Sequence, residues 1–99
     1  MNANLSGEKF IEECREQLEV AQEIEFSYNG CKYSIEATRT QTSVNVYETD
    51  GRGFEIWKFE NGSENGSVIA FSETIDGILN TACFDGKTFI EIQSQIQGE

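Results

Sequence analysis

The chain has 99 residues, of which 37% are hydrophobic and 11% aromatic, and its formal net charge is −11. This length suits one domain over residues 1–99 with a core of its own, and the aromatic content argues against a disordered chain. The absence of histidine excludes the common zinc, copper and haem ligand sets and every catalytic arrangement that pairs a nucleophile with histidine. We therefore expect no enzyme activity, no metal and no cofactor.

The charge balance also restricts the partners. Nucleic-acid phosphates and anionic membranes are held mainly by Lys and Arg, of which the chain has 7 against 18 Asp and Glu. We expect neither a direct nucleic-acid partner nor a membrane partner. Cys14, Cys31 and Cys83 are odd in number and lack the C-x-x-C spacing, so reduced thiols are expected. Without a signal-peptide pattern or a long apolar run, the sequence favours the cytoplasm.

A first helix is predicted over residues 7–22. Ser6 suits the N-cap, and Leu5 and Phe10 occupy the positions of a hydrophobic staple. Helical periodicity gathers one apolar stripe, formed by Phe10, Ile11, Cys14, Leu18 and Ala21. The opposite side gathers an acidic face, which in most helices is simply solvated, formed by Glu8, Glu12, Glu16, Glu19 and Glu23.

The next segment predicts a β-hairpin, because Asn29-Gly30 stands between two runs of alternating residues and suits a type I′ turn. Counting outward from this turn gives the apolar pairs Tyr28/Cys31, Phe26/Tyr33 and Ile24/Ile35. The intervening pairs are polar, so one face of the hairpin is expected in the core and the other in water. A slip of one residue would turn the apolar set outward, so this register should be strongly specified.

A second hairpin is predicted from strands at 43–48 and 54–60 joined by the turn Asp50-Gly51-Arg52-Gly53. If Val44, Val46, Phe54 and Ile56 face the helices, the opposite parity carries an aromatic group, a possible partner-binding surface, formed by Tyr47, Trp57 and Phe59. The alternative is that this parity is the inner one or that both faces of the sheet are covered.

The C-terminal part is predicted to contain a strand at 67–71 and two short helices. Ser72 suits the first N-cap, and Asp85 suits the cap of a helix over residues 86–97 that Gly98 ends. The first of these helices is expected to bury a stripe formed by Ile75, Ile78, Leu79 and Ala82. Cys83 and Phe84 are expected to anchor the joint between the two.

Two blocks, Y-N-G-C-K-Y-S-I at 28–35 and D-G-K-T-F-I-E-I-Q-S-Q-I at 85–96, resemble a pattern found in small bacterial proteins of unknown function. In that family a YxGxxYxI-like hairpin is followed by sheet and by a DGKxxxEIxxxI-like terminal helix. The shared motifs are a turn and a helix cap, so the resemblance implies a fold and carries no activity.

The elements predict one α+β domain. Its antiparallel sheet of four or five strands is covered on one face by the N-terminal helix and the two short C-terminal helices, since each helix has one apolar stripe. For function we expect a small, acidic, non-enzymatic protein-interaction module that binds an unidentified protein or a second copy of itself. The alternative is an acidic mimic of nucleic acid that inhibits a DNA- or RNA-handling enzyme, although the glutamates of the first helix are spaced more widely than DNA phosphates.

Overall fold

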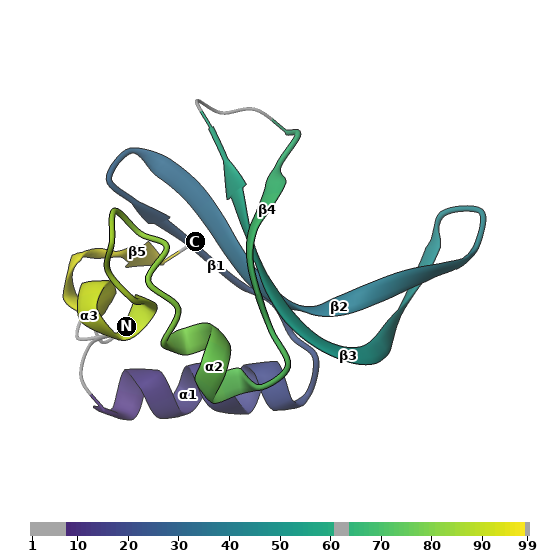
Figure 1. Cartoon of the computed structure of the whole chain (residues 1–99), viewed down its shortest axis with the longest axis horizontal. Helices are drawn as coiled ribbons and strands as arrows, with labels where there is room; N and C mark the ends of the chain where they lie inside the picture. The colour runs from purple at the N-terminus through teal and green to yellow at the C-terminus, as the bar shows by residue number, and fades with distance from the viewer. Residues whose placement is uncertain (1–7, 61–63, 99) are drawn as a thin grey trace.

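The computed structural model of the chain describes residues 8–60 and 64–98. In chain order the described elements are α1 (Glu8–Glu19), β1 (Ile24–Tyr28), β2 (Cys31–Ser43), β3 (Val46–Phe59), β4 (Ser67–Ser72), α2 (Ile75–Leu79), α3 (Phe89–Ile92), the 3-10 turn η1 (Gln93–Gln95) and β5 (Gln97–Gly98). The strands form one antiparallel sheet in the order β4-β3-β2-β1-β5, and the helices lie on one side of it (Figure 1). The predicted α+β fold is confirmed.

Helix α1 packs on the sheet through its apolar stripe, where Ile11, Cys14 and Leu18 are buried. The helix ends at Glu19, three residues before the predicted end. Ala21 adopts a positive φ of 62°, and the amides of Gln22 and Ala21 bond to the carbonyls of Gln17 and Leu18. This is the Schellman motif, which closes a helix with one left-handed residue. The proposed Ser6 cap and Leu5 staple position lie outside the described residues.

The first hairpin has the predicted register, with Ile24 opposite Ile35, Phe26 opposite Tyr33 and Tyr28 opposite Cys31. Five of these six side chains are buried, while Cys31 is half-buried. Asn29 and Gly30 have φ angles of 52° and 84°, as a type I′ turn requires.

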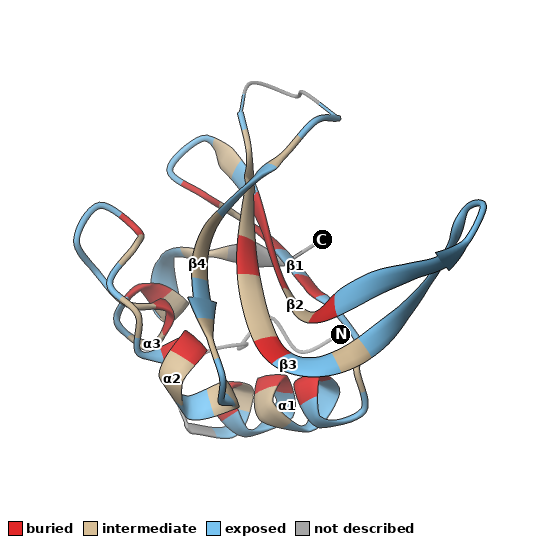
Figure 2. Cartoon of the chain, turned by 45° about the vertical axis from the view of Figure 1, so that its right-hand side comes forward, coloured by how far each residue is buried: buried red, intermediate tan, exposed pale blue. Residues whose placement is uncertain are grey.

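The second hairpin differs from the prediction. Strands β2 and β3 form a single long hairpin that turns at residues 44–45, so Asp50-Gly51-Arg52-Gly53 lies inside β3 and is not a connection between strands. Residues 39–49, which we call the arm, are all exposed and extend away from the helices (Figures 1 and 2). Val44 and Val46 were expected to face the helices; they lie near the tip of the arm instead, 82% and 44% exposed.

The misassigned turn is an irregularity at the base of the arm. The ladder passes from the pair Ala37/Phe54 to the pair Arg39/Thr49, so four residues of β3 lie opposite one residue of β2 here. Asp50 organises these residues: its carboxylate accepts from the hydroxyls of Thr38 and Thr40 and from the backbone amide and Nε of Arg52. The Asp-Gly chemistry that suggested a chain reversal therefore makes a bulge.

Gly53, the last residue of this irregularity, lies against β4. A Cβ placed there would come within 2.4 Å of the Ser72 carbonyl oxygen and 2.9 Å of the Glu73 Cα. Because these are backbone atoms, no larger residue fits without moving the strand.

The C-terminal helices are shorter than predicted and are capped by other residues. Thr74, not Ser72, is the N-cap of α2, and Thr88, not Asp85, is the N-cap of α3, where it forms a capping box with Glu91. Asp85 belongs instead to a tight turn closed by the Phe84–Lys87 bridge.

The predicted last helix stops at Ile92, and the chain continues through η1 to β5. Gly98 pairs with Phe26 in that strand and does not end a helix. The stripe predicted for the preceding helix is partly right, because Ile78 and Leu79 are buried whereas Ala82 is exposed.

An aromatic cluster forms the centre of the core between the sheet and the C-terminal segment. The ring centroid of Phe26 lies 5.5 Å from that of Tyr33, 5.7 Å from that of Phe84 and 5.1 Å from that of Phe89. Phe84 is fully buried, as expected for the residue that anchors the joint. Within residues 8–60 and 64–98, no helix is long and apolar enough to cross a membrane.

Candidate functional site

The register of the sheet assigns each strand residue to one of two faces. The pair Ile35/Ile56 is buried against the helices, so we call this side the inner face. The adjacent pair Ser34/Trp57 belongs to the opposite side, the outer face. Figures 1 and 2 show the described helices on the inner side only. The outer face is therefore the face of the sheet that no described helix covers.

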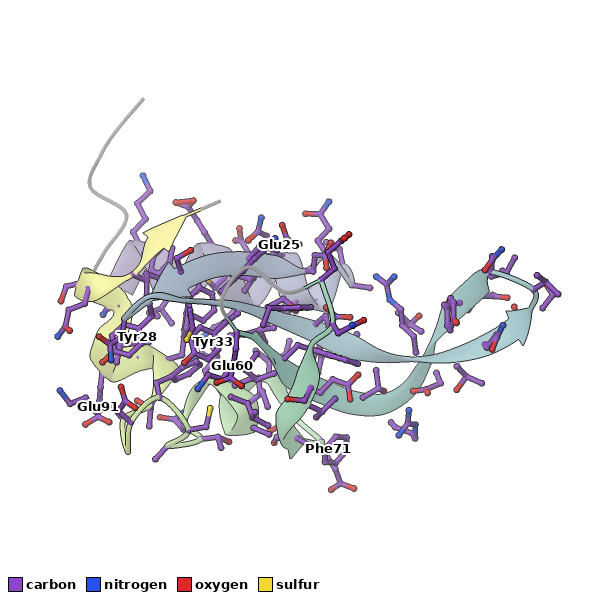
Figure 3. All side chains as sticks on the ribbon, turned by 90° about the horizontal axis from the view of Figure 1, so that it is seen from above. Glu25, Tyr28, Tyr33, Glu60, Phe71 and Glu91 are labelled. Atoms are coloured by element: carbon purple, nitrogen blue, oxygen red, sulfur yellow. The ribbon has the colours of Figure 1, made fainter. Side chains whose placement is uncertain are left out.

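Four apolar side chains form a patch on the outer face of β3 and β4. Trp57 and Phe59 are half-buried and stacked, with ring centroids 6.4 Å apart and planes inclined by 19°. Val68 is paired with Trp57 across the strands, and Phe71 is paired with Glu55, which places both on this face. Val68 and Phe71 are 45% and 49% exposed, and Figure 3 shows Phe71 projecting outward beside β4. We call these four residues the outer-face patch.

Neighbouring groups hold the two stacked rings in place. The indole Nε1 of Trp57 donates to Glu55 Oε1 over 3.2 Å. On the Phe59 side, a Cβ at Gly66 would lie 2.5 Å from the ring, so the glycine allows the loop to rest directly on it. The Trp57 and Phe59 rings are therefore held in place by their neighbours in the sheet.

Of the three residues predicted to form a partner-binding surface, the structure brings together Trp57 and Phe59 and separates Tyr47. Tyr47 is paired with Gln41 near the tip of the arm and is 56% exposed. The separation follows from the turn at 44–45, which places the first part of β3 beyond the body of the sheet (Figure 1).

The sequence analysis missed Val68 and Phe71 as members of this surface. The run Ser67–Ser72 contains an extra residue, because the β3–β4 ladder shifts between the pairs Ile56/Ala70 and Trp57/Val68. Simple alternation along β4 would put Ile69 with Phe71, whereas Ile69 packs toward the core. Only the cross-strand pairs reveal which apolar residues of β4 face outward.

The outer face also carries two opposed carboxylates beside the patch. Glu36 and Glu55 are paired across β2 and β3, and both are half-buried. The Ser34 hydroxyl donates to Glu36 Oε2 over 2.8 Å. Burial raises the pKa of Glu36, and the negative charges of Glu23 and Glu55 raise it further, against the lowering effects of Ser34 and Arg39. This is the one place in the described sheet where two acidic side chains are cross-strand partners.

The acidic face predicted on α1 is exposed at Glu12, Glu16 and Glu19, and Glu23 is exposed just beyond the helix. Glu8 is the first residue of α1. Among the basic residues of this helix, Arg15 forms an ion pair with Asp76 of α2. Within the described part of the chain, Glu12, Glu16, Glu19 and Glu23 share no hydrogen-bond or ion-pair partner and are all exposed.

Burial keeps two of the thiols, Cys14 and Cys83, and the phenol of Tyr33 in their protonated forms. Burial raises the pKa of Cys14 to about 12 and that of Cys83 to about 11. Burial likewise raises the pKa of Tyr33 to about 12. These groups therefore stay protonated near neutral pH, whereas a nucleophilic cysteine requires its thiolate form.

Within residues 8–60 and 64–98, no group of three or more Cys, Asp or Glu side chains could hold a metal ion. A shallow depression between α1 and α3 is lined by Ile11, Arg15 and Ile90, among others. The Arg15 guanidinium in this depression is already paired with Asp76.

Comparison with protein-family models, with curated proteins and with solved structures finds no match. The resemblance carried by residues 28–35 and 85–96 therefore stays a prediction.

Proposed function

We propose that this chain is a small, non-enzymatic protein-interaction module that binds a protein through the outer face of its sheet. The observation that carries the proposal is the stacked Trp57–Phe59 pair, which stands with exposed Val68 and Phe71 on the face that no described helix covers. Apolar side chains gathered on an uncovered face mark interaction sites, and aromatic residues contribute strongly to binding energy there.

The charge of the chain bears on the class of partner. At −11, two copies repel each other at long range, whereas a protein with a basic surface is attracted and steered toward the module. We therefore favour a basic protein partner over self-association. A cytoplasmic location is part of the proposal, because the three cysteines are free thiols and a reducing compartment keeps them so.

A pull-down from cell extract tests this function. The wild-type chain is compared with Trp57→Ala and, as the control, Tyr47→Ala, which truncates an exposed aromatic residue on the arm. We expect Trp57→Ala to lose a partner that Tyr47→Ala retains, and we expect capture to persist at moderately raised salt because apolar contacts are not screened. Equal capture by all three chains would refute the outer-face patch as the binding surface.

The mimic of nucleic acid remains the alternative proposal and uses a different surface. Its test is the double variant Glu12→Lys/Glu19→Lys in the same pull-down. Capture of a nucleic-acid enzyme that this variant abolishes, and that disappears in high salt, would favour the mimic over the module.

A further inference from the structure

The outer face holds a negatively charged pair that the fold only partly compensates. Glu36 and Glu55 are direct cross-strand partners, and like charges in this position destabilise a sheet. Each carboxylate receives one side-chain donor from its own strand, from Ser34 at 2.8 Å and from Trp57 at 3.2 Å. Both donors are neutral, so the remaining acceptor positions of the pair favour a cation.

The charged groups around this pair do not neutralise its negative charge. Glu23 adds a further negative charge near Glu36, and Arg39 is the basic residue that acts in the opposite direction. Arg39 belongs to the exposed arm, where it is paired with Thr49 in the ladder. A cation supplied from outside the chain would therefore gain from both carboxylates at once.

An aromatic surface lies directly beside the carboxylates. The Trp57 indole is tied to Glu55 through its Nε1 and is stacked with Phe59. A guanidinium group is planar, donates from several N–H groups in a fixed arrangement, and stacks on aromatic rings. A lysine ammonium can approach the same charges but offers neither the fork geometry nor the flat face.

We propose that Glu36, Glu55 and the Trp57 indole together form a docking position for an arginine side chain on a basic segment of the protein partner. The inference rests on the proposed function, in which the outer-face patch supplies the apolar contact area. The arginine determines which basic segments fit, because it joins the two carboxylates and lies against the ring.

The test uses short acetylated oligoarginine and oligolysine peptides of equal length, titrated into the full chain at low salt. Binding is followed by the fluorescence of Trp57, the single tryptophan of the chain, and by calorimetry. We expect saturable binding of oligoarginine that is about tenfold tighter than that of oligolysine, which corresponds to about 1.4 kcal/mol.

A matched pair of double variants separates the site from general attraction. Glu36→Gln/Glu55→Gln and Glu12→Gln/Glu19→Gln raise the net charge equally, but only the first changes the outer face. We expect the first to weaken oligoarginine binding about tenfold or more and the second to change it less than about twofold. Circular dichroism checks that both variants fold. If Glu36→Gln/Glu55→Gln did not fold, this would contradict the claim that Glu36 and Glu55 repel each other.

Three results of the peptide titrations would overturn the inference. They are equal weakening in both double variants, equal affinity for the two peptides, and no binding of oligoarginine. If Glu36→Gln/Glu55→Gln captures the protein partner normally while Trp57→Ala does not, the proposed arginine position is wrong and the proposed function stands. If Trp57→Ala also captures it normally, the proposed function itself fails.

Discussion

Asn29 donates a hydrogen bond from its side-chain Nδ2 to Asp85 Oδ2 over 3.0 Å, linking positions 56 residues apart. Each residue is the first of an Asx-Gly turn with two positive φ angles, 52° and 84° at 29–30 and 55° and 82° at 85–86. The two turns, which lie far apart in the sequence, therefore meet in the fold. Beneath this bond, Phe84 packs on Tyr33 with centroids 5.0 Å apart.

A double-mutant cycle with Asn29→Gly and Asp85→Gly measures this link, because glycine keeps the positive φ of each turn. The bond is exposed, so we expect a coupling free energy of about 0.5–1 kcal/mol in urea unfolding. Additive effects within the error of the measurement would show that the bond contributes nothing to stability.

Truncation of the aromatic core should be far more costly than loss of a buried thiol. Phe26 is 1% exposed and contacts Tyr33, Phe84 and Phe89, so Phe26→Ala is expected to destabilise the fold by about 3–5 kcal/mol. Cys14 is equally buried, but Cys14→Ala removes one atom and should be tolerated better. Chemical denaturation of both variants checks the order, and the reverse order would contradict the assigned core.

The end of α1 offers a stabilising substitution. Ala21 adopts the left-handed conformation at the C′ position of the Schellman motif, where glycine avoids a steric cost of about 1–2 kcal/mol. Since glycine also loses more entropy on folding, we expect Ala21→Gly to stabilise the chain by about 0.5–1 kcal/mol. Val20→Gly is the control, and it should destabilise because Val20 precedes the left-handed position. A lower melting temperature for Ala21→Gly would argue that α1 ends elsewhere.

The base of the arm depends on a buried hydroxyl. Thr38 is fully buried and donates to Asp50 Oδ1 over 2.5 Å. Thr38→Val keeps the shape but removes a hydrogen bond to a charged group, so we expect a loss of about 1.5–3 kcal/mol. Relative to wild type, this variant should speed up hydrogen exchange more at the amides of the arm than at those of β1, which would locate the effect. Thr42→Val, on the exposed arm, is the control and should change little.

The same contacts predict how the arm responds to acid. Hydrogen bonds from Thr38, Thr40 and Arg52 hold the pKa of Asp50 well below its ordinary value of 3.8. A depressed pKa means that the carboxylate stabilises the fold above the ordinary value and that this contribution is lost as pH falls below it. The difference between the thermal melts of wild type and Asp50→Asn should therefore begin to shrink below about pH 3.8 and should be lost only as pH falls through the lower pKa of the folded state. A difference that is independent of pH would contradict the role of the ionised carboxylate.

Glu36 should show the opposite dependence on pH. Its pKa is raised, chiefly by burial, so the folded state disfavours the carboxylate and the chain loses stability as pH rises above the ordinary value of 4.5. Glu36→Gln can still accept from Ser34, and at neutral pH we expect it to be more stable by about 0.2–1 kcal/mol. The gain should shrink in acid. A loss of stability at pH 7 would show that the pair with Glu55 is not repulsive.

The hairpin at 24–35 could be predicted from the sequence because its determinants are local. Asn29-Gly30 sets the turn, and the alternation of Ile24, Phe26 and Tyr28 against Tyr33 and Ile35 leaves one register that buries the apolar set. The stripe of α1 followed from helical periodicity in the same way. The α+β class then follows, because one-sided helices and a one-sided hairpin bury these surfaces by packing together.

The tertiary structure decided which turn signals reverse the chain and which apolar residues face outward. Asp50-Gly51-Arg52-Gly53 and Asp85-Gly86 have similar local chemistry, yet the first is a bulge because Thr38 and Thr40 of the neighbouring strand satisfy the Asp50 carboxylate. A register shift in β4 places both Val68 and Phe71 on the outer face with Trp57, and alternation along the strand alone does not reveal this shift. Likewise Glu36 and Glu55 became neighbours only through the β2–β3 pairing. The bulge, the outward-facing residues and the carboxylate pair all depend on contacts between residues distant in the sequence. The free energy of these contacts outweighs the local conformational preference of the chain.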